Sequence, residues 1–326
     1  MKTTGDPIDF GFLLIPQFSM LSFAGVLEPL RMANRLAGAP LYRWWLFTPD
    51  DQPVLASNGI PFRPTAEIGH PGPLDTLIVV ASIDVASYCT PAILHWLRAL
   101  ASRGINLGAT SVGPLLLAKA GLLNHRRCTL HWENINGLRE EFPDLDLTNE
   151  LYEIDGKRLT CSGGTAGLDM MMHLIGQRHG YQLAVDVAEQ CIHPEIRESR
   201  ASQRLSLRNR LNVTNPHLVA VIECMELHLE DTLSCDQLAR QVGLSVRHMH
   251  RLFKKNLAMS PSAFYLDLRL KRARALLEQT GLPISEIALA CGFAAAPHFA
   301  SCYKRRFKQT PSSERLRSLN DYPRNY

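Results

Sequence analysis

Ser111 is the residue whose type and setting best suit covalent chemistry. It lies in the segment Gly108–Leu123 (GATSVGPLLLAKAGLL), which we expect to run from the end of a strand through a tight turn into a helix. A side chain at such a corner stands at the carboxyl edge of a sheet beside a helix N-terminus, where backbone N–H groups stabilise an anion. His131, in the segment Thr129–Glu133, is the candidate base. Because the same spacing fits a serine that only caps the helix, both interpretations stay open.

The residues around 250 carry side chains that suit nucleic acid instead. Arg247, His250, Arg251 and Lys254 are spaced so that they share the outer face of one helix. Arg and His side chains can donate hydrogen bonds to base edges in the major groove of DNA, and Lys neutralises phosphate. We therefore expect this face to contact DNA.

Strands and helices alternate around Ser111 in the first half of the chain. Phe10–Ile15 and Leu77–Val80 are short apolar runs, typical of buried strands in a parallel sheet. Phe23–Leu36, Pro91–Arg103 and Gly164–His179 have apolar residues at helical spacing. This order predicts an α/β domain of the flavodoxin-like kind, a parallel sheet with helices on both faces.

Two short helices and a tight turn position the basic residues near 250. Ser234 is placed to cap a helix that Gly243 ends, and Ser245 is placed to cap the next helix, whose Met249 and Phe253 face inward. This arrangement is a helix-turn-helix unit, in which the second helix enters the major groove.

A second unit of the same kind follows. Ala288–Gly292 repeats Ala239–Gly243, and a helix through Phe299 and Tyr303 comes after it. Between the two units, the pattern of Phe264–Leu277 predicts a basic amphipathic helix that sets their separation. We expect an all-α domain that presents two helices to successive major-groove turns, about 10 base pairs apart.

Charge and composition agree with this division. The chain has 326 residues, of which 46% are hydrophobic and 20% charged. Residues 1–194 carry a net charge of −5 and residues 195–326 one of +9, which favours a nucleic-acid partner for the second half. The eight cysteines form no C-x-x-C pair and no cluster with zinc-site spacing, so we expect neither a metal nor a cofactor. No apolar run is long enough to span a membrane and no signal peptide is recognisable, so we expect a cytoplasmic protein with no membrane partner.

The second half resembles the AraC/XylS family of transcription regulators. The resemblance rests on the two units, on the central Arg269-Leu270-Lys271-Arg272-Ala273, and on the closing pattern from Gly292 to Pro311. It implies DNA contacts at the positions that are here Arg247, His250, Arg251, Ala296, Pro297, His298 and Ser301. Ser301 occupies a position that is often Arg or Lys in the family, and Ala294–Pro297 offers few hydrogen-bond donors. We therefore expect the first unit to supply most of the base discrimination. The second unit is expected to bind the DNA backbone through Lys304, Arg305 and Arg306.

The first half resembles the PfpI-like, class I glutamine-amidotransferase-like domain. Gly113, the stretch Leu116–Leu123, the segment His131–Glu133 and the stretch Gly163–Asp169 carry this resemblance. Ser111 stands where the enzymes of that family have a nucleophilic Cys. A thiolate is a nucleophile near neutral pH and a serine hydroxyl needs an activating base, so we interpret the domain as a sensor.

The resemblance also suggests where a ligand would bind. It points to Glu28, Ser111, Val112, His131 and Trp132 as ligand-binding residues, with Glu28 facing a cationic group. The alternative for Glu28 is an exposed carboxylate on a helix. Five aromatic residues are further candidates for the face of a quaternary ammonium, although such residues are more often part of a core: they are Trp44, Trp45, Tyr88, Trp96 and Trp132.

Together the two resemblances imply a sensor fused to AraC-type DNA binding, in the subgroup that regulates the catabolism of glycine betaine, carnitine or arginine. We expect a transcriptional activator. Its expected partners are promoter DNA, a small nitrogenous inducer, RNA polymerase and a second copy of the chain. The dimer is expected to form through the sensor domain. A hydrolase or amidase that uses Ser111 and His131 is the rival hypothesis. The expected divisions are residues 1–193 (sensor), 194–215 (linker), 216–317 (DNA binding, with units at 234–255 and 284–307) and 318–326 (tail).

Overall fold

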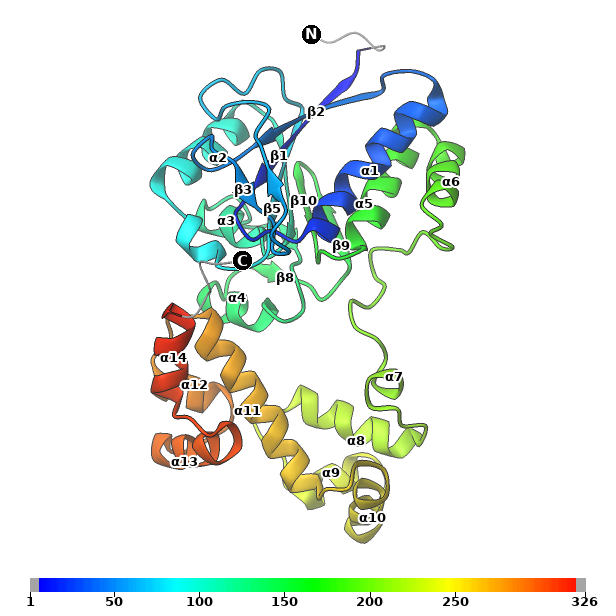
Figure 1. The fold of residues 1–326 in the computed structure, drawn as a ribbon. Helices are drawn as coiled ribbons and strands as arrows, with labels where there is room; N and C mark the ends of the chain where they lie inside the picture. Colours follow the sequence, from blue (N-terminus) through cyan, green and yellow to red (C-terminus); the bar gives the residue numbers. More distant parts are fainter. Residues whose placement is uncertain (1–5, 321–326) are drawn as a thin grey trace. The chain divides into compact units, whose positions relative to one another are not determined.

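The computed structural model describes residues 6–320 (Figure 1). The chain divides by its internal contacts into two compact units, and the division falls between Gln203 and Arg204. We call these the sensor unit and the helical unit and describe each by itself. Among the described residues, no helix is long and apolar enough to cross a membrane.

A six-stranded sheet forms the centre of the sensor unit. Its strand order is β2-β1-β5-β6-β10-β9. The strands are β1 (Ile8–Leu14), β2 (Tyr42–Phe47), β5 (Thr76–Ala81), β6 (Asn106–Ser111), β9 (Tyr152–Asp155) and β10 (Arg158–Cys161). The expected parallel pairing is confirmed for five strands, whereas β9 runs antiparallel to β10. Only two residues, Gly156 and Lys157, join β9 to β10, and so short a connection can join only antiparallel strands.

Helices cover both faces of the sheet, as predicted. They are α1 (Met20–Ala37), α2 (Pro91–Ser102), α3 (Pro114–Lys119), α4 (Ile135–Glu141), α5 (Ala166–His179) and α6 (Tyr181–Gln190), with the 3₁₀ helix η1 (Val85–Tyr88). Phe12 and Val80 point to the core under α1 and α5, while Leu13 and Val79 point to the core under α2 and α3. Successive residues alternate between the faces because side chains in a strand have a period of two. Two minor pairs complete the unit, β3 (Val54–Leu55) with β4 (Pro61–Phe62) and β7 (Arg127–Cys128) with β8 (Asp146–Leu147).

One long helix organises the helical unit. The elements are α7 (Leu207–Leu211), α8 (Pro216–Leu227), α9 (Cys235–Gln241), α10 (Val246–Leu257), α11 (Pro261–Gln279), α12 (Ile284–Ala290), α13 (Ala296–Phe307) and α14 (Pro311–Asn320). Phe264, near the start of α11, packs into one core with α8, α9 and α10. Leu277, near its end, packs into another core with α12 and α13. The central helix therefore holds one helix-turn-helix unit at each end, as the sequence predicts.

Candidate functional site

Ser111 ends β6 in a strained conformation. Its φ angle is +56°, a left-handed value that costs an ordinary residue about 1–2 kcal/mol. The N–H of Gly113 donates to the carbonyl of Thr110 at 2.9 Å and closes the turn into α3. The predicted strand-to-helix corner is confirmed, and we call residues 110–113 the elbow.

Glycines let the backbone fold tightly around the elbow. A Cβ on Gly163 would stand 2.6 Å from the Cβ of Ser111, and one on Gly113 would stand 2.7 Å from the carbonyl oxygen of Val79. Both distances are shorter than any normal contact. Ser111 is only 5% exposed, so the elbow is a buried part of the sheet edge.

The elbow leaves no free backbone donor where an acyl-transfer enzyme needs one. The N–H of Val112 donates to the carbonyl of Ala81 at 3.2 Å, although the residue after a nucleophile supplies an oxyanion-hole donor in hydrolases built on such a turn. Cys161, the last residue of β10, pairs with Thr110 in the sheet and is fully buried. Burial raises the pKa of that thiol to about 12, so Cys161 stays protonated and unreactive.

His131 is tied to the elbow through its backbone. Its N–H donates to the carbonyl of Ser111 at 3.0 Å. Burial lowers the pKa of the His131 imidazole, and the Glu133 carboxylate opposes that shift from 3.7 Å. The ring lies 5.5 Å from that of Trp132. Three of the residues proposed from sequence, Ser111, His131 and Trp132, are thus grouped at one corner.

Ser22 is a residue of the elbow that sequence analysis missed. It is buried in α1, and its hydroxyl accepts the N–H of Gly164 at 2.9 Å. The same oxygen would lie 3.0 Å from a Cβ on Gly163. Ser19 caps α1 and starts it earlier than predicted, which places Ser22 in the first turn. In the sequence, Ser22 directly precedes the apolar helix pattern that we recognised from Phe23, and this position was the available signal.

Glu28 lies elsewhere on α1. Its carboxylate pairs with Arg31 at 2.6 Å, and its side chain is 38% exposed. This geometry fits the exposed-carboxylate alternative, and a ligand role for Glu28 stays a prediction. The α1 residue at the elbow is Ser22.

The aromatic candidates divide between core and surface. Trp96 is buried against Phe47, with 5.4 Å between ring centroids, and Trp44 packs against the core under α1. Tyr88, in contrast, lines an open cleft of about 470 Å³ with Pro16 and Asp50. This cleft lies at the carboxyl ends of β1, β2 and β5, where the strand order changes direction, the usual ligand position in open α/β sheets.

In the first helix-turn-helix unit, the predicted basic face of α10 is exposed. Ser245 caps the helix, and Met249 and Phe253 are fully buried, as predicted. The exposed residues include all four candidates, Arg247, His250, Arg251 and Lys254.

In the second unit, α13 exposes its candidates too. They are Pro297, His298, Ser301, Lys304 and Arg305. Arg306 differs from the others, because its guanidinium pairs with Asp267 at 2.5 Å and lies over the Phe307 ring. Its charge is therefore partly offset within the protein, and its contact with the DNA backbone stays a prediction.

Arg269 of α11 is a structural residue that holds the second unit in place. It donates to the carbonyls of Cys291 and Gly292 at 2.7 and 2.6 Å and lies 4.1 Å from the centroid of Phe293. It thereby satisfies the carbonyl groups left free where α12 ends.

No group of three or more His, Cys, Asp or Glu side chains in the described part of the chain could hold a metal ion.

Comparison with known proteins decides the family. Residues 238–317 match the model of the helix-turn-helix domain, and residues 26–177 match that of the DJ-1/PfpI family. The HTH-type transcriptional regulator CdhR of Pseudomonas aeruginosa is 46% identical over 94% of this chain and 91% of its own length. The regulator GbdR of the same species is 41% identical over 95% and 84%. This chain is an AraC-family helix-turn-helix regulator with an N-terminal DJ-1/PfpI domain.

Solved structures agree with this assignment. An AraC family transcriptional regulator from Pseudomonas putida superposes with a TM-score of 0.52 and 27% identity, over 57% of this regulator and 100% of that chain. Drosophila melanogaster DJ-1beta superposes with a TM-score of 0.50 at 14% identity, over 58% of this regulator and 100% of that chain, which shows the shared fold. CdhR and GbdR are named as transcriptional regulators and not as enzymes, in agreement with the occupied backbone donor at Val112.

Proposed function

We propose that this AraC-family regulator activates transcription from promoter DNA when a small nitrogenous metabolite binds its sensor unit. The observation that carries the proposal is the union, in one chain, of a strained elbow without a free oxyanion donor and a pair of exposed recognition helices. Such an elbow is suited to binding a ligand and not to turning it over.

The ligand site in this proposal is the carboxyl edge of the sheet. Ser111, Val112, His131 and Trp132 lie there, and so does the Tyr88 cleft. An aromatic face and a carboxylate are the groups that attract a quaternary ammonium or a guanidinium. Tyr88 and Asp50 supply both in the cleft. Burial raises the pKa of Tyr88, and the Asp84 and Asp50 charges add to that shift. These groups suit a quaternary ammonium or guanidinium compound, and the resemblance to regulators of glycine betaine, carnitine or arginine catabolism narrows the proposed inducer to these three.

For DNA, the proposal assigns different tasks to the two recognition helices. Arg247, His250 and Arg251 of α10 read base edges, and Lys254 contacts phosphate. On α13, Pro297, His298 and Ser301 approach the groove while Lys304 and Arg305 bind the DNA backbone. The exposure of all these residues supports the assignment.

The remaining partners follow from the same activity. We propose that the regulator works in the cytoplasm as a homodimer formed through the sensor unit, and that it contacts RNA polymerase at the promoter. A dimer provides paired half-sites, which two-fold symmetric operators require.

Calorimetric titration of the full chain tests the ligand. Glycine betaine, carnitine and arginine are added separately to the wild type and to Tyr88→Ala and His131→Ala. We expect one compound to bind the wild type, with affinity reduced at least tenfold in one or both variants. Leu205→Ala, an exposed position outside the sensor unit, is the control and should bind normally. Failure of all three compounds would overturn the proposed inducer class.

A further inference from the structure

Residues 193–203, which we call the strap, follow α6 and are fastened to the sensor unit. Asp169 of α5 is fully buried and holds the first part of the strap. Its carboxylate accepts the backbone N–H of Arg197 at 2.8 Å and that side chain's Nη2 at 2.6 Å. His193 Nε2 lies 2.9 Å from the same carboxylate. This end of the strap is an ion-pair anchor.

The middle of the strap pairs with the body as a short strand would. The N–H of Leu151 donates to the carbonyl of Ser199 at 2.8 Å, and Glu150 forms an antiparallel bridge with Ser202.

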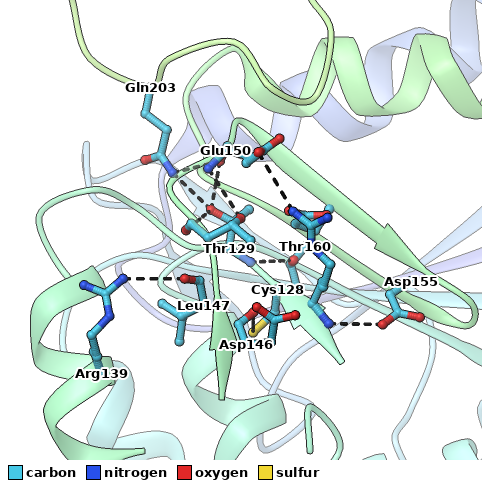
Figure 2. A network of polar contacts seen from close by, with 12 residues as sticks. Cys128, Thr129, Arg139, Asp146, Leu147, Glu150, Asp155, Thr160 and Gln203 are labelled. Carbon is cyan, nitrogen blue, oxygen red and sulfur yellow. Dashed lines mark hydrogen bonds and ion pairs between the residues drawn. The ribbon is translucent and has the colours of Figure 1, made fainter. Parts of the chain in front are cut away.

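Gln203 fastens the last residue of the strap. Its side-chain amide nitrogen lies 3.0 Å from Thr129 Oγ1 and 2.9 Å from the carbonyl of Glu150 (Figure 2). The same nitrogen lies 3.0 Å from the carbonyl of Leu130. Two amide hydrogens serve these three acceptors. The Oε1 atom of Gln203 is buried without a hydrogen-bond partner. An unsatisfied buried acceptor destabilises the docked strap, so less free energy is needed to release it.

Both places where the strap is fastened lead directly to the elbow. Leu130, which accepts from Gln203, precedes His131, whose N–H donates to the carbonyl of Ser111. Leu151, which donates to the strap, accepts the N–H of Ser162 at 2.8 Å, and Ser162 precedes Gly163, the residue pressed against Ser111. A shift of the elbow therefore reaches the strap within one or two hydrogen bonds on either side.

Beyond Gln203 the chain is soon fixed again. Leu207 and Val213 are buried in the core of the helical unit, and Arg210 pairs with Glu226. Of the linker expected over residues 194–215, residues 204–206 lie between the strap and the first helix of the helical unit. Extended, the stretch from Gln203 to Leu207 spans at most about 14 Å, whereas release back to Arg197 extends it to about 35 Å.

We propose that the strap is a ligand-controlled tether: ligand binding at the carboxyl edge of the sheet displaces the elbow, which changes the docking of the strap and so changes how far the DNA-binding unit can reach. This inference rests on the proposed function for the ligand, but the docking and its link to the elbow do not. Tether length sets the effective concentration of one DNA-binding unit for its half-site. A regulator could thus switch without rearranging either unit.

The docking is tested with Gln203→Leu in the full chain, with Gln182→Leu of α6, an exposed glutamine, as the control. Hydrogen–deuterium exchange read by mass spectrometry should be at least tenfold faster for residues 198–206 in Gln203→Leu, and small-angle scattering should show a larger maximum dimension. The control should match the wild type in both. Unchanged exchange in Gln203→Leu would overturn the proposal.

The link to the elbow is tested without any ligand. Gly163 and Gly59 both have left-handed φ angles, so alanine is strained at either position. In Gly163→Ala the new Cβ also presses against Ser111 and forces the elbow apart, whereas in Gly59→Ala it meets nothing within 4 Å. We expect faster exchange of residues 198–203 only in Gly163→Ala. Equal exchange in the two variants would refute the coupling.

Adding glycine betaine, carnitine or arginine to the wild type separates the two proposals. If one of them binds and strap exchange changes, both are supported. If one binds and strap exchange is unchanged, the tether is wrong while the inducer class stands. If none binds, the inducer class fails, and the two glycine variants still decide whether elbow and strap are coupled.

Discussion

The N–H of Val112 donates to the carbonyl of Ala81, the last residue of the neighbouring strand β5. The strained turn at Ser111 is therefore kept while the donor that would stabilise an oxyanion is consumed by the sheet. Conformational strain persists only where surrounding structure enforces it, and Gly163, Gly113 and the His131 backbone do so here. An elbow of this kind can still respond to a ligand that presses on it.

Gly292 and Gly243 provide a matched test of the helical unit. Both have left-handed φ angles, but a Cβ on Gly292 would stand 2.7 Å from the carbonyl oxygens of Leu229 and Glu230, whereas one on Gly243 meets nothing within 4 Å. We expect Gly243→Ala to cost about 1–2 kcal/mol of unfolding free energy and Gly292→Ala clearly more.

Urea unfolding of the full chain measures this difference by two probes. All four Trp residues lie in the sensor unit, so their fluorescence follows that unit alone, while circular dichroism at helical wavelengths follows both. Only the dichroism transition should shift, and by more in Gly292→Ala. Equal shifts in the two variants would show that the close approach of Gly292 to the α8–α9 loop is not important for stability.

Arg269→Lys should destabilise the second helix-turn-helix unit. A lysine carries the charge but cannot reach both the Cys291 and Gly292 carbonyls with a planar fork. We expect a loss of about 1–3 kcal/mol for the charged hydrogen bonds, detected by dichroism in urea. Lys255→Ala, a change at an exposed position on α10, should leave that transition unchanged.

Much of this architecture could be predicted from sequence because it depends on local patterns. Caps at Ser234 and Ser245 and the glycine at 243 define the first helix-turn-helix unit within a few residues. The strap could not be predicted, because Gln203 meets Thr129 and Asp169 meets Arg197 only after distant segments fold together. A polar, Arg-rich stretch resembles a flexible linker until its partners are known. Ser22 was missed for the same reason, since its role depends on the approach of Gly164.

Acid should destabilise the sensor unit partly through His131. Burial lowers its pKa in the fold, so below its ordinary value of 6.5 the unfolded chain binds more protons and unfolding is favoured as the pH falls. We expect Trp fluorescence in urea to show a smaller loss of stability between pH 7.5 and 5.5 in His131→Gln than in the wild type. Burial also lowers the pKa of His179, so some loss should remain. An identical loss in both proteins would mean that His131 titrates normally.

Arg251 and Lys304 should differ in how they contribute to DNA binding. Arg251→Ala removes a candidate base contact, and we expect it to weaken binding to a regulated promoter fragment by about 1–3 kcal/mol more than binding to random-sequence DNA. Lys304→Ala removes a phosphate contact, which should weaken binding to both DNAs equally and reduce the slope of log affinity against log salt by about one.

Arg306→Ala is the matched control on α13, because the charge of Arg306 is already paired with Asp267. The salt slope of this variant should change less than that of Lys304→Ala. Fluorescence anisotropy titrations at several salt concentrations measure all three variants. Equal losses on both DNAs for Arg251→Ala would place that residue on the phosphate backbone, and a full unit of slope for Arg306→Ala would show that the pair with Asp267 opens on DNA.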